Sequence, residues 1–205
     1  MSSTLFILII VFGSFLCLFT LIVIGLAYTA TRGISKGRDA WKQFAAKYGL
    51  TFQQSSPLGY GIVTGQYQGR NVNLQAYTTT GTQRSRHTWT VVSLTVNNPK
   101  GISVSIKANA GISEIEKGFG GQGSSISNEE FLRKFVVQSN PPGLAESMLK
   151  NDPNLRQRIL EATPSELVYK DQNAAYEAMG LRLDTGQLEE MFRLISDFAD
   201  VVEKG

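Results

Sequence analysis

Residues 87–96 read HTWTVVSLTV and form the clearest strand pattern in this chain of 205 residues. Most of these side chains are β-branched or aromatic, the types that favour extended structure. A polar, Thr-rich segment at residues 78–86 precedes them, and the turn-forming sequence NNPKG follows at residues 97–101. The pattern therefore predicts one long strand between two turns, with Tyr77 and Trp89 pointing into the sheet.

Shorter strand patterns lie on both sides of this stretch. Residues 61–67 and 71–77 predict two strands, of which the second alternates between apolar and polar side chains, and Gly69 in the turn between them can supply a positive φ. Residues 102–106 (ISVSI) alternate in the same way. Because these connections are too short for a crossover helix, they predict an antiparallel β-meander.

Helix patterns and shorter strand patterns fill the rest of the chain. Residues 131–138, 166–170 and 174–179 predict strands, whereas residues 144–149, 154–162 and 187–202 predict helices. Residues 39–48 predict a helix with Trp41, Phe44, Ala45 and Tyr48 on one face. This short helix could lie on a bilayer surface or pack into the core, and the core position is favoured because only one face is apolar. Strands followed by helices indicate an α+β fold.

An uncharged stretch at residues 5–28 reads LFILIIVFGSFLCLFTLIVIGLAY. As a helix it would span about 36 Å, enough to cross a hydrocarbon core of about 30 Å. A cleaved signal peptide is the competing interpretation, but no basic residue precedes the stretch and its length exceeds that of a signal peptide. The sequence therefore predicts an N-terminal transmembrane helix at residues 1–30, a basic linker at 31–37 and an α+β domain at 38–205.

Basic residues follow the apolar stretch, whereas none precedes it. The positive-inside rule then places the N-terminus outside and the domain in the cytoplasm, at the inner (plasma) membrane or, in a photosynthetic cell, the thylakoid membrane. Residues 1–110 carry ten Lys or Arg against one Asp, and residues 111–205 carry ten against sixteen acids. This asymmetry favours a basic side facing an anionic surface, although folding could mix the two halves. The candidate contacts with anionic lipid or a partner are Arg32, Lys36, Arg38, Lys42, Arg84 and Arg86.

Signatures of catalysis are weak. The sequence GFGGQG at residues 118–123 matches a dinucleotide-binding pattern but lacks the buried strand that should precede it. His87 is the only histidine, and the only cysteine, Cys17, lies in the apolar stretch. We therefore expect no catalytic site, no metal site and no cofactor. Nucleic-acid binding would need a larger basic stripe with interleaved aromatic residues.

The soluble part resembles bacterial single-pass membrane-anchored proteins of unknown function. The resemblance rests on the pattern of Trp41, Phe44 and Ala45, on Tyr48–Gly49–Leu50, on Gly65, Tyr67, Gly69 and Arg70, on Phe131, Phe135 and Val137, on Pro142, Ala145 and Leu149, and on the closing amphipathic helix. It implies a tethered accessory domain with no active-site residues. We expect a non-enzymatic protein that binds, assembles or stabilises a membrane protein complex, with a tethered ligand or lipid sensor as the alternative.

Overall fold

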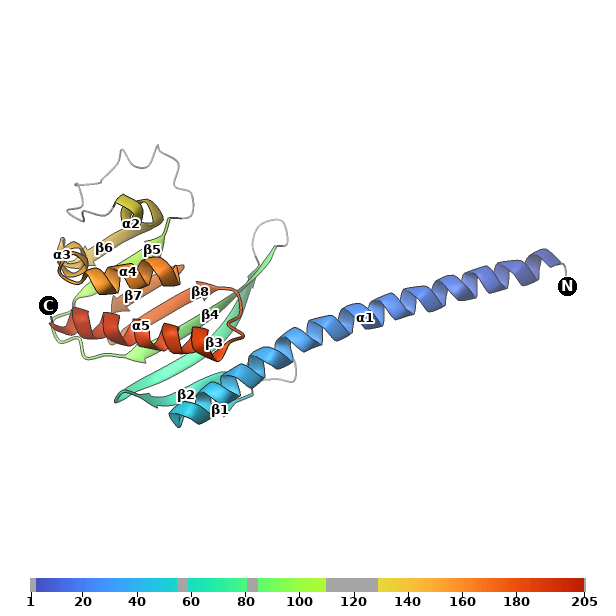
Figure 1. The fold of residues 1–205 in the computed structure, drawn as a ribbon, viewed down its shortest axis with the longest axis horizontal. Helices are drawn as coiled ribbons and strands as arrows, with labels where there is room; N and C mark the ends of the chain where they lie inside the picture. Colours follow the sequence, from blue (N-terminus) through green and yellow to red (C-terminus); the bar gives the residue numbers. More distant parts are fainter. Residues whose placement is uncertain (1–2, 55–58, 81–84, 110–128, 205) are drawn as a thin grey trace.

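The N-terminal helix α1 (Ser3–Tyr48) is 46 residues long and extends far from the rest of the molecule (Figure 1). At 1.5 Å per residue it measures about 69 Å. The computed structural model describes residues 3–54, 59–80, 85–109 and 129–204, and within α1 it leaves out the side chains of residues 3–11, 14 and 24–35. Residues 31–37, expected as a linker, are part of this helix. Within the described residues, no helix has an apolar window that qualifies as a membrane span.

The described strands form one antiparallel sheet of eight strands in the order β1-β2-β3-β4-β8-β7-β5-β6. Strands predicted from alternation alone recur with small shifts at their ends. Their bounds are β1 (Thr51–Gln53), β2 (Ile62–Tyr67), β3 (Arg70–Thr80), β4 (Arg86–Thr95), β5 (Ser103–Ala108), β6 (Phe135–Asn140), β7 (Glu166–Lys170) and β8 (Asn173–Met179).

The meander predicted from the short connections is only partly correct. Strands β1 to β4 follow one another in space, and Gln68 and Gly69 form the two-residue turn between β2 and β3, both with positive φ. The prediction that β5 lies beside β4 is wrong, because the β7–β8 hairpin pairs between them. The segment between β4 and β5 therefore passes over the positions of β8 and β7 and does not form a hairpin turn.

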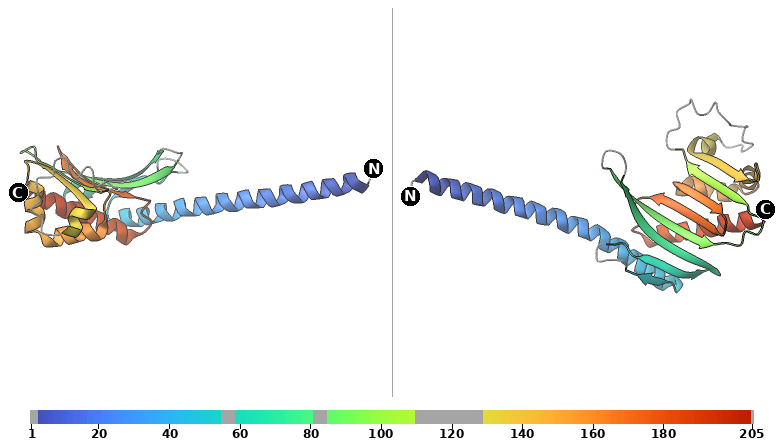
Figure 2. Two further views of the ribbon diagram at one scale, coloured as in Figure 1. Left: turned by 90° about the horizontal axis from the view of Figure 1, so that it is seen from above. Right: turned by 180° about the vertical axis from the view of Figure 1, so that it is seen from behind.

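The helices cover one face of the sheet, and the other face has no helix on it among the described residues (Figure 2). Besides the C-terminal part of α1, this layer contains α3 (Leu144–Asn151), α4 (Pro153–Ala162) and α5 (Thr185–Lys204), and α2 (Glu129–Lys134) lies by β6. The expected α+β class is therefore confirmed for the described domain.

The strand predicted at residues 131–138 is partly wrong. Its first part is the helix α2, and β6 begins only at Phe135. Phe131 and Phe135 are four residues apart and their ring centroids lie 5.0 Å apart, while Glu130 and Lys134 form an i,i+4 ion pair. Both spacings stabilise a helix, and a short apolar run does not distinguish helix from strand by itself.

The core lies between the sheet and the helix layer. Trp41, Phe44 and Ala45 of α1 are buried in it, which confirms the core position for residues 39–48. The apolar side of the closing amphipathic helix, α5, is buried as well, including Phe192 and Phe198. The expectation for Tyr77 and Trp89 is wrong: their alternate neighbours enter the core, so these two rings lie on the uncovered face.

Candidate functional site

The basic residues predicted to contact lipid or a partner come from two elements. Lys36 and Lys42 are exposed on α1, and Arg38 between them is half-buried. Arg86 is exposed at the start of β4 rather than in a loop. Arg84 and the GFGGQG sequence at residues 118–123 lie outside the described residues, as does the side chain of Arg32.

Residues 180–183, which we call the junction, connect these two elements. The backbone N–H of Gly180 donates a hydrogen bond of 2.7 Å to the carbonyl of Thr88 in β4. The indole Nε1 of Trp41 in α1 donates one of 3.0 Å to the carbonyl of Arg182. Thr90 donates from its hydroxyl to the Gly180 carbonyl and accepts from the Arg182 N–H. The junction is therefore bound to both the helix and the sheet.

Close packing strengthens this connection. A Cβ atom added at Gly37 would lie 2.8 Å from Cδ2 atoms of both Leu181 and Leu183. Glycine at this position lets α1 approach the junction closely. The basic part of α1 and the start of β4 are consequently parts of one end of the domain, a placement that the sequence alone did not indicate.

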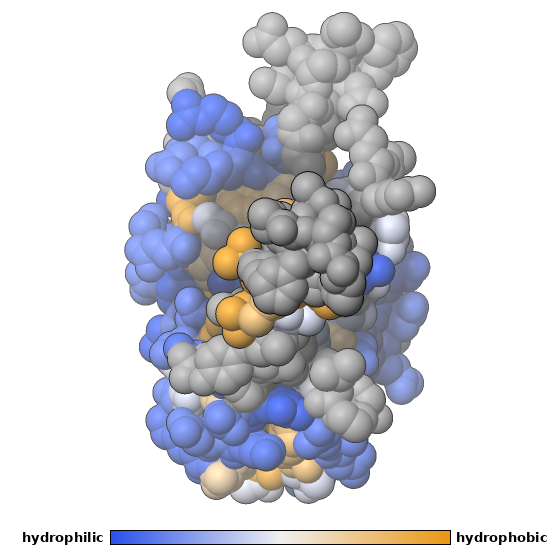
Figure 3. Space-filling view, turned by 90° about the vertical axis from the view of Figure 1, so that its right-hand side faces the viewer, coloured by the Kyte–Doolittle hydropathy of each residue, from blue (hydrophilic) through white to orange (hydrophobic). Residues whose placement is uncertain are grey.

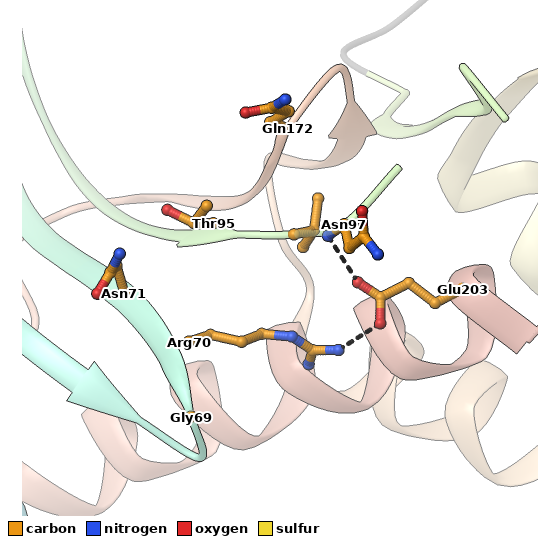
Figure 4. Close-up of a pocket in the computed structure, with 8 residues that line it drawn as sticks. Gly69, Arg70, Asn71, Thr95, Asn97, Gln172 and Glu203 are labelled. Carbon is orange, nitrogen blue, oxygen red and sulfur yellow. Dashed lines mark hydrogen bonds and ion pairs between the residues drawn. The ribbon is translucent and has the colours of Figure 1, made fainter. Parts of the chain in front are cut away.

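A second polar cluster, which we call the Arg70 clamp, lies at the other end of the sheet. Nη2 of Arg70 lies 2.7 Å from Oδ1 of Asp200 and 2.7 Å from Oε2 of Glu203, both on α5. Oε1 of Glu203 accepts a hydrogen bond of 3.2 Å from the backbone N–H of Asn97, which follows β4 (Figure 4). The Asn97 carbonyl in turn accepts from the hydroxyl of Tyr169 at 3.2 Å.

The charges in the Arg70 clamp stabilise one another. Burial lowers the pKa of Arg70, but its hydrogen bonds and charge interactions with Asp200 and Glu203 outweigh that effect and raise it above its ordinary value. Burial and the negative charge of Glu203 raise the pKa of Tyr169. The guanidinium also donates a hydrogen bond of 3.4 Å to the Ser196 carbonyl of α5.

An open groove of about 400 Å³ adjoins the Arg70 clamp. Polar side chains dominate its lining, and Asn71, Thr95 and Gln172 lie around it (Figure 4). Because both carboxylates near Arg70 are already engaged with it, the cluster offers a structural clamp rather than an acid–base pair. In the part of the chain that the structure describes, no group of three His, Cys, Asp or Glu side chains could hold a metal ion.

Sequence reasoning did not identify the Arg70 clamp. Asp200 and Glu203 are three residues apart and thus share one face of a predicted helix, which was the only local signal. Their partner Arg70 lies well over a hundred residues away, and the pairing depends on α5 crossing the β2–β3 turn. A single sequence contains no signal for such a contact.

Replacing Arg70 by methionine should destabilise the protein by about 2 kcal/mol. The guanidinium is only 17% exposed, so its loss leaves two carboxylates facing each other without a cation. The effect should be smaller than for a fully buried pair, because Asp200 is 46% exposed. Urea unfolding of the full chain in mild detergent measures this change. Arg193→Met is the control. The Arg193 side chain on α5 is 60% exposed, so its loss should change stability by no more than about 0.5 kcal/mol.

Comparison with known proteins finds similarity at the level of fold. No family model matches the chain, and no curated protein sequence matches it significantly. Among solved structures, the chain is similar to the crystal structure of the mycobacterial trehalose monomycolate transport factor A, TtfA, with a TM-score of 0.51 and 15% sequence identity. The match covers 83% of this chain and 95% of that one. At this identity the similarity concerns the arrangement of strands and helices only.

Proposed function

We propose that this protein is a non-enzymatic, membrane-tethered accessory protein whose domain binds, assembles or stabilises a membrane protein complex. The observation that carries the proposal is the continuity of α1, which runs without a break from the apolar stretch at residues 5–28 into the domain core. A helix with one end in the core and an uncharged other end is suited to hold a domain at a bilayer.

The apolar side chains of the projecting part of α1 support the anchor. Large hydrophobic side chains are exposed all along its described portion, which is unfavourable in water. They are Phe12, Phe15, Leu16, Leu18, Phe19, Leu21, Ile22 and Val23. The 24 uncharged residues of the full stretch would cover about 36 Å, so lipid can bury this surface along its whole length.

The anchor and the domain are also joined firmly. Trp41 is fully buried and bonds to the junction, and Gly37 packs against Leu181 and Leu183. Lys36, Arg38 and Lys42 follow the apolar stretch on the domain side. By the positive-inside rule, this supports a cytoplasmic domain at the inner (plasma) membrane with the N-terminus outside.

The uncovered face of the sheet is the surface that we assign to the partner. Side chains in one row across the eight described strands are small or polar except for Val168, in the order Thr51, Thr64, Asn73, Ser93, Ala175, Val168, Ser105 and Gln138. Oδ1 of Asn73 and Oγ of Ser105 in this row are buried without a hydrogen-bond partner among the described residues. The structural neighbour is a transport factor, which is in keeping with an accessory role beside a membrane transport system.

Site-directed crosslinking in native membranes tests the partner. A photoreactive residue replaces Gln75, exposed on the uncovered sheet face, or Gln157, exposed on α4 as the matched control. After illumination and purification in mild detergent, we expect a discrete adduct from position 75 and none from position 157. Recovery of the monomer alone from both positions would count against the proposal.

Protease digestion tests the orientation. Protease added to intact spheroplasts should leave the domain intact, because a cytoplasmic domain is protected by the membrane.

A tethered sensor is the second candidate, and the open groove beside the Arg70 clamp is the observation that favours it. Its polar lining would suit a small polar ligand rather than an apolar one. A thermal-shift screen of polar metabolites on the full chain tests this role. A ligand that raises Tm for the wild type and not for Asn71→Ala would support the sensor, and the absence of any such ligand would remove it.

A further inference from the structure

The hairpin formed by β3 and β4 extends beyond the sheet as a two-stranded ribbon. Strand β2 pairs with β3 only as far as Gln75, and β8 pairs with β4 only from Trp89 onward. Beyond these points the two strands pair only with each other, from Thr78↔Thr88 to Thr80↔Arg86. In all three ribbon views this ribbon lies on the side of the domain toward which α1 extends (Figures 1 and 2).

Hydrophobic side chains collect at the base of the ribbon. Tyr77, Trp89 and Met179 are paired across three neighbouring strands and therefore form one row on the uncovered face. Tyr77 is 40% exposed and Met179 is 51% exposed. We call these three residues the ribbon patch. Leu183 of the junction is 44% exposed as well, beside Gly37 of α1. Figure 3 views this side of the molecule and shows hydrophobic residues among hydrophilic ones.

The rings of the ribbon patch have their polar atoms satisfied. The hydroxyl of Tyr77 donates a hydrogen bond of 2.8 Å to Glu177, and Nε1 of Trp89 donates one of 2.9 Å to Thr79. Burial and the contact with Glu177 raise the pKa of Tyr77 to about 12, so the phenol stays neutral. An apolar ring with a satisfied polar tip is the kind of side chain that is enriched at the boundary between lipid and water.

The dimensions of the molecule let the ribbon reach the lipid headgroups. Gly37, where α1 meets the junction, follows the last residue of the apolar stretch, Tyr28, by nine positions, or about 14 Å along the helix. The headgroup layer occupies roughly 5–8 Å of that distance. From Trp89 to Arg86 the ribbon extends about 10 Å further. The remaining distance of about 6–9 Å is within the length of the ribbon, so a ribbon directed toward the bilayer brings Arg86 to the headgroup layer.

The charges around the ribbon favour an anionic surface. Residues 76–80 and 86–90 contain no acid, and Arg86 is exposed among them, with Lys36 and Lys42 exposed on α1. Of the acids nearby, Glu177 accepts from Tyr77, Glu166 opposite it is 3.2 Å from Lys107, and Asp184 accepts from the Gln187 N–H at the start of α5. Asp39 is exposed on α1 between the two lysines, so the basic residues outnumber it there. Exposed basic residues beside interfacial aromatic residues are typical of a surface that binds anionic lipid.

We propose that the ribbon patch and Arg86 form a second membrane-contact surface, which binds the anionic headgroups of the bilayer that holds α1. This inference rests on the proposed membrane anchor. With a single point of attachment, the domain could rotate about α1. A second contact prevents that rotation and holds the uncovered sheet face at a constant angle to the bilayer, ready for a membrane-embedded partner.

Tryptophan fluorescence tests this contact in the full chain. The chain has two tryptophans, and Trp41 is fully buried, so Trp89 is the residue that lipid can reach. The protein is reconstituted into phosphatidylcholine vesicles with or without phosphatidylglycerol, each containing lipids brominated near the headgroup end of the chains. We expect about twofold stronger quenching in the anionic vesicles, reduced by 0.5 M NaCl and abolished in Trp89→Phe.

Two variants and one independent readout make the result decisive. Arg86→Gln should reduce the quenching. Arg193→Gln, on the exposed side of α5, should leave it unchanged. Flotation with the vesicles reports the anchor separately, so failure to float would refute the anchor rather than the ribbon contact. Flotation with no quenching of Trp89, or with equal quenching in both vesicle types, would overturn the proposal. Quenching that appears only with an added membrane protein would assign the ribbon to that protein instead.

Discussion

Replacing Leu16 and Phe19 by arginine should release the protein from the membrane fraction. Both side chains are exposed on α1, at 57% and 58%, near the middle of the apolar stretch. Each arginine at the centre of a spanning helix costs about 2.5–3.5 kcal/mol, so the pair removes about 5–7 kcal/mol of insertion free energy. Membranes are washed with carbonate and sedimented, and the fraction of full-length protein in the pellet is measured.

The control carries the same two charges at the same spacing on the same helix. Gln43 and Ala46 are exposed on the part of α1 that packs onto the domain, and Gln43→Arg with Ala46→Arg should leave the protein in the pellet. This comparison separates the effect of apolar burial from that of added charge. Wild-type protein in the supernatant without detergent, or an arginine pair at positions 16 and 19 that stays in the pellet, would refute the anchor.

The second large effect is expected at Trp41, which connects the helix to the domain. Its side chain is 0% exposed, and its Nε1 donates to the Arg182 carbonyl in the junction. Trp41→Ala removes the largest buried side chain that α1 contributes and should destabilise the domain by about 3–5 kcal/mol. In urea unfolding of the full chain in mild detergent, read by pulse proteolysis, the midpoint should fall by about 2 M.

Two further variants distinguish packing from hydrogen bonding at this position. Trp41→Phe keeps most of the buried ring and loses the donor, which should cost about 1 kcal/mol. Gln43→Ala, on the exposed side of α1, should change stability by no more than about 0.5 kcal/mol. Equal losses for the phenylalanine and alanine variants would show that the hydrogen bond, and not packing, stabilises the junction.

The contrast between residues 87–96 and 131–138 shows where the local sequence pattern is enough to predict a strand. The first stretch is long and rich in β-branched residues, and it forms β4 almost as predicted. The second is short, and its phenylalanines have a spacing that a helix can also use, so α2 takes its first part. The rings of Tyr77 and Trp89 were placed on the wrong face because alternation shows which residues share a face but not which face is covered.

The candidate surfaces also differ in how much of them the sequence can predict. The basic residues Lys36, Arg38 and Lys42 could be found from the sequence, because they lie close together in the chain and on one helix. Their link to Arg86 depends on the junction, and the Arg70 clamp depends on α5 crossing the β2–β3 turn. These contacts join residues that are distant in the chain, so no periodicity or spacing indicates them.

The sequence by itself determined most helices and most strands, the α+β class and the uncharged stretch of the first helix, because each depends on side chains within a few residues of one another. The tertiary structure alone decided that β7 and β8 lie between β4 and β5, which face of the sheet stays uncovered and which residues surround the ribbon. The physical reason is that strand order and helix placement are set by burying the whole core at once, a balance to which every element contributes.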